Sequence, residues 1–187
     1  MLLDITLPVT SNMLGAAWQN TDKALVGHLG THFDVMDKAF PLEYTRRKAI
    51  VFDVSHIRGR DITVADIDID LVESNMFVAF YTGFIEEVAY GTPTYFKEHP
   101  QLDNKLIEAL IQKQISIIGV DCAGIRRTPE HVPIDRLCAN NNVFVVENLW
   151  DLKKILAAGN HFIANTYPMR FVGPTGIPCR VVAQLDP

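Results

Sequence analysis

Two short apolar runs separated by an amphipathic stretch constrain the fold of this chain more than any other feature. Residues 76–81 and 115–120 are continuous apolar runs, as in strands buried on both faces, and Gly83 and Asp121 closely follow them. Residues 102–114 lie between them and carry leucines and isoleucines at helical spacing. A strand, a helix and a strand in this order predict a crossover unit, and therefore an α/β fold with a mixed sheet.

The other segments fill in the order of elements. Further strands are expected at residues 2–7, 49–55, 143–146, 161–165 and 180–185. A second helix is expected from Asn148, which can cap it, to about Ala158. Residues 8–22 and 122–141 are polar, contain prolines and are expected to be irregular loops. With 187 residues and no repeat or linker, the chain is expected to be one domain, residues 1–187.

Bulk properties exclude several classes of function. A net charge of −5 implies no basic face for nucleic acid. No apolar run approaches the roughly 20 residues that span a bilayer, so no membrane partner is expected. Cys122, Cys138 and Cys179 have no paired spacing, and the chain begins without an apparent export segment. Free thiols in a reducing, cytoplasmic compartment are therefore expected.

The stretch from His28 to Asp34 concentrates the candidate metal ligands. His28, His32 and Asp34 are nitrogen and oxygen donors of the kind that bind Zn²⁺ or Mn²⁺. A straight helix would turn Asp34 about 120° away from His32, and a straight strand would hold the imidazoles roughly 13 Å apart. A bend at Gly30 would bring all three to one ion, because glycine accepts backbone angles closed to other residues. From spacing alone, ordinary polar histidines are an equally good interpretation.

These residues resemble the signature of the cyclase family of metal-dependent hydrolases, which includes bacterial kynurenine formamidase and isatin hydrolase. The family pattern is His-x-Gly-Thr-His-x-Asp-x-Pro-x-His, and the chain matches it from His28 to Asp34. Met36 then stands in place of the proline, and Lys38 in place of the last histidine. Four further segments resemble the family: Leu3-Asp4-Ile5-Thr6-Leu7-Pro8, Tyr81-Thr82-Gly83-Phe84, Ile118-Gly119-Val120-Asp121 and Val146-Glu147-Asn148-Leu149.

The resemblance implies a fold and a reaction. The expected fold is a mixed sheet partly closed into a barrel with helices packed outside. The expected cofactor is one divalent metal ion, Zn²⁺ or Mn²⁺, bound by His28, His32 and Asp34 with Glu147 as a possible fourth ligand. The expected reaction is hydrolysis of a small amide or cyclic amide, with N-formylkynurenine, and hence tryptophan catabolism, as the default. A homodimer or homotetramer is expected from the same resemblance.

Two departures from the family fall together. In the family, histidines at the positions of Lys38 and Asp135 are expected at a second metal, and both are replaced here. One hypothesis is that the Lys38 ammonium supplies the missing positive charge among Asp34, Asp135 and Glu147, which would keep it protonated despite burial. The alternative is that both changes are drift in a decayed site. Either way, at most one ion per chain is expected.

Catalytic and substrate-binding roles follow from these expectations. Glu147 or Asp34 would accept a proton from water, and Lys38 is the third candidate catalytic residue. Trp18 is a candidate lid over the substrate or an ordinary packing residue. Asp121 follows a strand, where α/β proteins place functional side chains, but it could equally cap the next turn.

Other functions stay open at this point. A non-catalytic descendant that still binds a metal or small molecule is the main alternative to the hydrolase. A thiol enzyme has little support, because no cysteine lies in a recognisable motif. His131 is the histidine of interest outside the motif, since it lies in the polar segment before Glu147.

Overall fold

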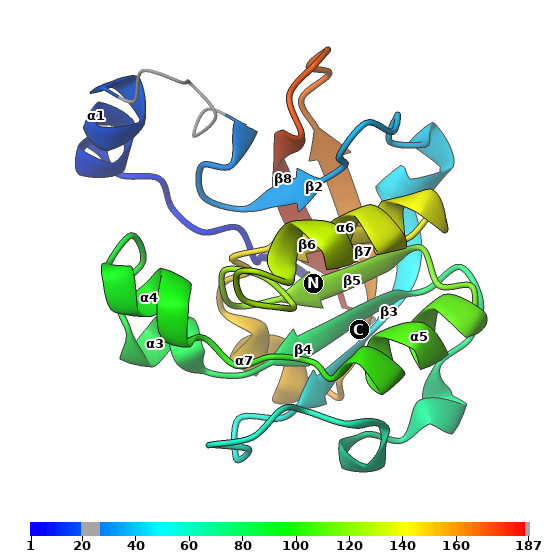
Figure 1. Ribbon diagram of the computed structural model, residues 1–187. Coiled ribbons are helices and arrows are strands. Elements are labelled where there is room, and N and C mark those ends of the chain that lie inside the picture. The colour runs from blue at the N-terminus through cyan, green and yellow to red at the C-terminus, as the bar shows by residue number, and fades with distance from the viewer. Residues whose placement is uncertain (20–26, 186–187) are drawn as a thin grey trace.

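The computed structural model describes residues 1–19 and 27–185, and a single eight-stranded sheet organises them (Figure 1). The strands are β1 (Leu2–Asp4), β2 (His32–Asp34), β3 (Arg46–Asp53), β4 (Phe77–Tyr81), β5 (Ile117–Val120), β6 (Phe144–Glu147), β7 (His161–Pro168) and β8 (Gly176–Gln184). Their order is β1-β8-β2-β6-β5-β4-β3-β7, and β7 also pairs with β8. The sheet from β8 round to β7 therefore closes into a barrel, with β1 added at β8. The predicted α/β fold is confirmed, and its closure is complete.

Strand directions decide where functional side chains can gather. Strands β3, β4, β5 and β6 are mutually parallel, so their carboxyl ends meet at one edge of the barrel. Strand β2 runs antiparallel between β6 and β8. The predicted crossover is present, because a helix connects the parallel strands β4 and β5.

Helices cover the outside of the barrel. The helices are α1 (Ser11–Gln19), α3 (Phe84–Glu87), α4 (Pro93–Glu98), α5 (Asn104–Gln112), α6 (His131–Asn140) and α7 (Leu152–Leu156). Short 3-10 turns occur at Leu42–Thr45, Val64–Asp66 and Ile69–Leu71. Figure 1 shows α5 and α6 in front of the parallel strands. Among the described residues, no helix combines the length and apolar character needed to cross a membrane.

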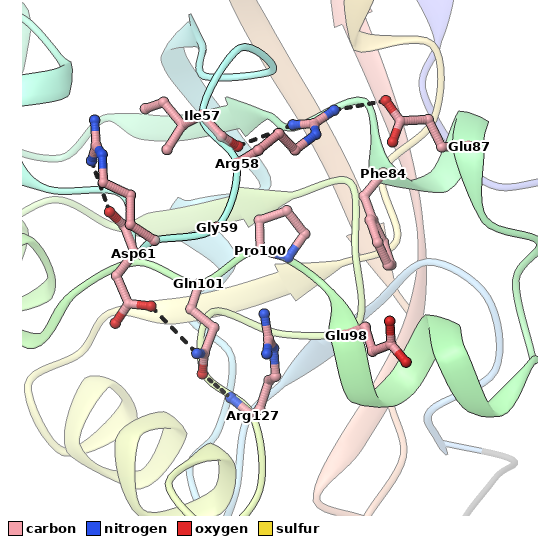
Figure 2. A pocket seen from close by; sticks show the side chains of 11 residues that line it. Ile57, Arg58, Gly59, Asp61, Phe84, Glu87, Glu98, Pro100, Gln101 and Arg127 are labelled. Atoms are coloured by element: carbon pink, nitrogen blue, oxygen red, sulfur yellow. Dashed lines mark hydrogen bonds and ion pairs between the residues drawn. The ribbon is translucent and has the colours of Figure 1, made fainter.

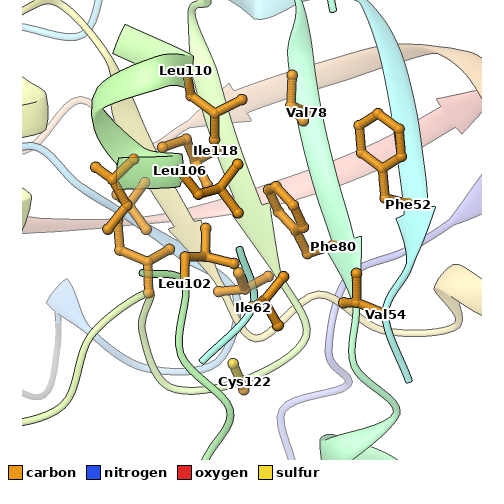
Figure 3. Packing of buried hydrophobic residues seen from close by; sticks show 14 of the residues in the cluster. Phe52, Val54, Ile62, Val78, Phe80, Leu102, Leu106, Leu110, Ile118 and Cys122 are labelled. Carbon is orange, nitrogen blue, oxygen red and sulfur yellow. The ribbon is translucent and has the colours of Figure 1, made fainter. Parts of the chain in front are cut away.

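Alternation along the strands builds two hydrophobic clusters. One cluster packs between the strands and α5, where Phe80 and Ile118 contact the layer that includes Leu106 (Figure 3). The other contains side chains from the opposite face of the strands, including Phe33 of β2, Phe77 of β4 and Val146 of β6, and fills the barrel. Because side chains alternate along a strand, the neighbours of Phe33 point to the outer face of the barrel, on the side of α6.

Three expected segments differ from the structure. Residues 8–22 were expected to be irregular but contain α1, where Ala16 and Ala17 favour a helix. Residues 122–141 were also expected to be irregular but contain α6, in which Pro133 occupies the first turn, where its missing N–H costs little. The expected helix from Asn148 begins only at Leu152, because Asn148 has a φ of 58°, outside the helical region.

Candidate metal centre

Strand β2 carries the core of the candidate centre. His32 and Asp34 flank the buried Phe33, and the chain bends at Gly30, where φ is 64°. His28 Nδ1 lies 3.0 Å from His32 Nε2 and 3.1 Å from Asp34 Oδ1. His32 Nε2 lies 3.8 Å from Asp34 Oδ1. Donors held about 2.1 Å from one ion lie about 3–3.5 Å from one another. The bend expected at Gly30 therefore gathers the three side chains.

The hydrogen bond at Nδ1 of His32 fixes which ring nitrogen faces the other candidate ligands. His32 Nδ1 lies 2.9 Å from the Gly30 carbonyl oxygen, which can only accept. We therefore assign the proton to Nδ1 and the lone pair to Nε2, the arrangement of a metal-ligating histidine. Asn148 Nδ2 donates to the same carbonyl at 2.9 Å, and the Tyr95 hydroxyl donates to Asn148 Oδ1 at 2.7 Å. A buried network thus holds the His32 ring.

Strand β6 adds Glu147 directly opposite His32. The antiparallel register of β2 and β6 pairs these two residues. Glu147 Oε2 lies 3.5 Å from His32 Nε2, and Glu147 Oε1 lies 3.7 Å from His131 Nε2. One carboxylate therefore faces two imidazoles. Glu147, expected as a possible fourth ligand, therefore lies beside His32 on the same side of the sheet.

Helix α6 brings a further imidazole and a third carboxylate. His131 and Asp135 are one turn apart, and His131 Nε2 lies 3.4 Å from Asp135 Oδ2. Asp34, His131 and Asp135 offer ligand atoms within 4.8 Å of one another, and so do His28, His32 and Asp34. Asp34 belongs to both groups, so the two candidate cation positions share a carboxylate.

The carboxylates of this centre are buried with too few protein partners. Asp34 and Asp135 are each 1% exposed, and Glu147 is 4% exposed. Within the described part of the chain, both oxygens of Asp34 and of Asp135, and Oε1 of Glu147, lack a hydrogen bond of acceptable geometry. Burying an uncompensated carboxylate is costly. A divalent cation would supply the missing charge, so this donor set fits a metal.

Burial sets the protonation states of the ion-free centre. It lowers the pKa of His32, which keeps that imidazole neutral and able to bind a cation. Burial also raises the pKa of Glu147 and of Asp135 well above their usual ranges, and the Asp34 charge adds to this effect. For Asp34 burial acts in the same direction, but His28, His32 and His131 outweigh it and lower the pKa. Asp34 is therefore the carboxylate that stays ionised.

The imidazole rings of His28 and His131 are the partly exposed side chains of the centre. The side chains of His28 and His131 are each 28% exposed, whereas that of His32 is 3% exposed. His28 Nε2 lies 3.0 Å from the Thr175 hydroxyl, which can accept its proton and leave Nδ1 facing Asp34. A small molecule could approach the buried carboxylates past these two rings.

Comparison with known proteins places this centre in a family. Residues 3–126 match the model of the family described as Putative cyclase. The chain belongs to that family. The matched region contains the segment from His28 to Asp34 and ends before α6. No curated protein matches the chain.

Solved structures share the fold. A protein described as a potential metal-dependent hydrolase with cyclase activity is 23% identical, with coverage of 100% of this chain and 99% of that one and a TM-score of 0.79. A predicted metal-dependent hydrolase from Bacillus stearothermophilus is 21% identical, with 98% and 97% coverage and a TM-score of 0.73. Isatin hydrolase A from Ralstonia solanacearum is 19% identical, with 86% and 73% coverage and a TM-score of 0.72. These likenesses confirm the expected architecture.

Lys38 does not take the place expected of it in this cyclase-family chain. Its ammonium lies 3.5 Å from Asp37 Oδ2, and its side chain is 38% exposed. Among the described residues, Lys38 forms no ion pair with Asp34, Asp135 or Glu147. The predicted salt bridge is therefore wrong. The chain turns at Met36, whose φ is 55°, and Lys38 follows this turn outside the cluster.

The two expected substrate-binding residues have different outcomes. Asp121 Oδ1 accepts hydrogen bonds from the Thr82 N–H at 2.9 Å and the Thr82 hydroxyl at 2.5 Å, and Oδ2 accepts from the Gly83 N–H at 2.7 Å. Asp121 thus ties the ends of β4 and β5 together, which favours the capping interpretation. Trp18 lies in α1, and its side chain lies outside the part of the structure that is described.

His131 is the candidate ligand that the sequence interpretation left unassigned. Once residues 131–140 are helical, His131 and Asp135 have the i, i+4 spacing that puts two side chains on one face. The spacing itself was visible in the sequence. Because Pro129 and Pro133 suggested a loop, it carried no weight.

The thiols do not form a competing site. Cys122, Cys138 and Cys179 are free and buried. Burial raises the pKa of each thiol, and Asp121 and Glu147 add to this effect at Cys122. Thiolate is the reactive form of cysteine, so these residues are poor nucleophiles.

A polar cavity of about 330 Å³ lies away from the candidate ligands (Figure 2). Its charged side chains are largely paired: Arg58 donates to Glu87 at 2.7 Å, and Arg127 Nε donates to the His99 carbonyl at 2.6 Å. None of the candidate metal ligands lines it. The cavity is therefore separate from the metal centre.

Substitution Gly176→Ala is expected to weaken cation binding at the His28 position. A Cβ on Gly176 would lie 2.6 Å from two atoms of the His28 ring, so the ring must move. We expect a loss of about 10–100-fold in affinity, similar to losing a residue that orients a ligand. Competition titration against a chelating dye measures it. Gly15→Ala, where a Cβ meets nothing within 4 Å, is the matched control. Unchanged affinity in Gly176→Ala would contradict the placement of His28.

Proposed function

We propose that this chain is a metal-dependent hydrolase that cleaves the C–N bond of a small amide or cyclic amide. One divalent cation would be held by His28, His32 and Asp34, with Glu147 beside it. The observation that carries the proposal is the convergence of two imidazole nitrogens on one buried carboxylate, with all ligand atoms within 4.8 Å. Imidazole and carboxylate donors with open positions for water and substrate are typical of hydrolytic metal sites.

The bound cation supplies a positive charge that polarises a carbonyl oxygen and lowers the pKa of a nearby water. The chain's own groups do the rest. Glu147 lies between His32 and His131, and its buried Oε1 has no hydrogen-bond donor among the described residues. This oxygen is therefore the group we assign to accept a proton from water and return it to the leaving nitrogen. Asp34 Oδ1 lies 3.1 Å from His28 Nδ1 and 3.8 Å from His32 Nε2, so Asp34 faces the candidate cation and is the less suitable base.

The substrate class is the finer part of the proposal. Family membership favours a small carbonyl compound, and isatin hydrolase A, a protein of the same fold, is named for a cyclic amide substrate. The signature resembles that of kynurenine formamidase, which favours aryl formamides, with N-formylkynurenine first. We therefore propose aryl formamides and cyclic amides fused to an aromatic ring as the compounds to examine.

Chelation is expected to abolish hydrolysis, and added Zn²⁺ or Mn²⁺ to restore it. The purified protein would be assayed against aryl formamides, isatin-type lactams and, as a control, a linear dipeptide. Substitution Glu147→Gln should lower kcat by about 10²–10⁴-fold, because it removes a positioned proton acceptor while keeping the side chain's shape. Hydrolysis that survives exhaustive chelation would overturn a metal-dependent mechanism.

One observation favours a second candidate function, a non-catalytic metal-binding protein. Lys38 stands where the family signature has a histidine, and its side chain is partly exposed and paired with Asp37. A histidine that the family signature has at the second metal is thus missing from the sequence, and Lys38 does not replace its charge there. Tight metal binding without turnover of any compound in the panel would favour this alternative.

A further inference from the structure

We propose that the polar cavity of Figure 2 binds a small aromatic carboxylate, and that Arg127 is the cation that recognises it. The cavity has a volume of about 330 Å³, which lies within the range of about 300–1,000 Å³ typical of ligand pockets. None of the candidate metal ligands lines it. The inference therefore goes beyond the proposed function and does not depend on a bound cation.

The cavity lies where α/β proteins commonly bind ligands. Its walls come from segments that follow three parallel strands: residues 57–61 after β3, Phe84 after β4 and Arg127 after β5. The connection between α4 and α5 completes it. Side chains beyond the carboxyl ends of parallel strands are outside the packed core, so they can face a ligand.

Arg127 presents a guanidinium whose terminal amino groups are not used by the protein. Its Nε donates to the His99 carbonyl oxygen at 2.6 Å, and its backbone N–H donates to Gln101 Oε1 at 2.7 Å. In the two described ranges of the chain, the terminal amino groups donate no hydrogen bond, and no carboxylate oxygen lies within 4.0 Å of them. The hydrogen bond at Nε orients the guanidinium, so its two terminal N–H groups can bind both oxygens of a carboxylate.

The other charges of the cavity favour a ligand with one negative charge. Three arginines and three acidic residues line the cavity, so their formal charges cancel. The ion pairs of the lining residues are Arg58 with Glu87, Arg60 with Asp66, and Asp61 with Arg126. Glu98, which is exposed, and Arg127 form no ion pair with any residue that the structure describes. One such guanidinium beside an acidic rim suits a singly charged carboxylate better than a doubly charged phosphate, which the rim would repel more strongly.

Apolar side chains give the ligand its second feature. Ile57, Phe84 and Pro100 line the same space as Arg127 (Figure 2). A flat aromatic ring can cover these apolar groups while its carboxylate faces the guanidinium. Removing apolar surface from water then supplies affinity that a single ion pair open to solvent lacks.

Titration with benzoate, followed by the amide NMR signals of the protein as purified, tests the proposal. Saturable shifts are expected at residues 57–61, at Gln101 and at Arg127. Benzamide lacks the charge, acetate lacks the ring, and phenyl phosphate carries additional charge. Each should bind more weakly than benzoate, by about 10-fold for benzamide because a charge-assisted hydrogen bond is lost. Shifts confined to residues 28–34, or equal binding of any comparison compound, would overturn the proposal.

Two variants change the recognition of benzoate in opposite directions. Arg127→Gln removes the guanidinium and should weaken binding by at least about 10-fold. Glu98→Gln removes a negative charge from the rim and should strengthen binding by about 2-fold, the size expected for an exposed charge. The second variant keeps the test valid if Arg127→Gln fails to fold. Arg170→Gln, which changes an exposed arginine beyond β7, is the matched control and should bind as wild type does.

Unchanged affinity in folded Arg127→Gln, or no gain of affinity in Glu98→Gln, would contradict the assignment of Arg127 as the recognising cation.

Discussion

Substitution Asp34→Asn is expected to remove every tightly bound divalent cation from the protein, and its hydrolytic activity with them. Asp34 is the one residue common to both groups of ligand atoms. Its pKa is lowered by His28, His32 and His131, so it is the ionised carboxylate around which the imidazoles are arranged. The neutral amide cannot replace that charge. We expect affinity to fall by more than about 100-fold at each position, beyond the effect of losing an orienting residue.

The measurement is metal content after dialysis, together with hydrolysis of the compound panel. Asp37→Asn is the matched control, because Asp37 lies in the same segment but its side chain is 62% exposed and pairs with Lys38. It should keep its metal and its activity. If Asp34→Asn retained one ion at wild-type affinity, the shared-carboxylate arrangement would be wrong.

Saturation with metal is expected to raise the melting temperature by about 8–16 °C for each ion. A ligand present at 1,000 times its Kd stabilises the folded state by about 4 kcal/mol. For a domain of this size each kcal/mol shifts the melting temperature by about 2–4 °C. The physical source is the set of buried carboxylate oxygens on Asp34, Asp135 and Glu147 that lack hydrogen-bond donors among residues 1–19 and 27–185.

Scanning calorimetry with excess chelator and then with excess Zn²⁺ or Mn²⁺ measures this shift. Added KCl at equal ionic strength serves as the control, because a general screening effect would act through any salt. The Asp34→Asn variant should show almost no response to metal. A shift below about 2 °C in wild-type protein would mean that the buried carboxylates are stabilised in some other way.

Local patterns in the sequence predicted the parts of the structure that depend on neighbouring residues. The crossover formed by β4, α5 and β5 follows from two buried runs and one helical stripe, and it is present. The convergence of His28, His32 and Asp34 required only a bend at Gly30, and that glycine has a φ of 64°. Both features are decided within a few residues, where backbone preferences and side-chain periodicity dominate.

Features that depend on distant pairing were not predictable in this way. Closure of the barrel requires β7 to pair with β3 and β8 to pair with β2, and periodicity does not reveal such pairings between distant residues. The role of His131 depends on a helix whose prolines suggested a loop. The expected position of Lys38 among the carboxylates came from the resemblance to a family signature. The chain departs from that signature after Asp34. The turn at Met36 then decided where the ammonium lies.

Strand β2 links the ligand set to the order in which the chain can fold. The hydrogen bond from Asn148 to Gly30 joins residues 118 positions apart, at the place where β2 meets β6. Contacts between such distant residues form slowly, because a long loop must close before they contribute any stability. An unfolded chain therefore offers an ion only the nearby side chains of His28, His32 and Asp34. Glu147 joins them only when β2 pairs with β6, so the complete ligand set should form late in folding rather than guide its first steps.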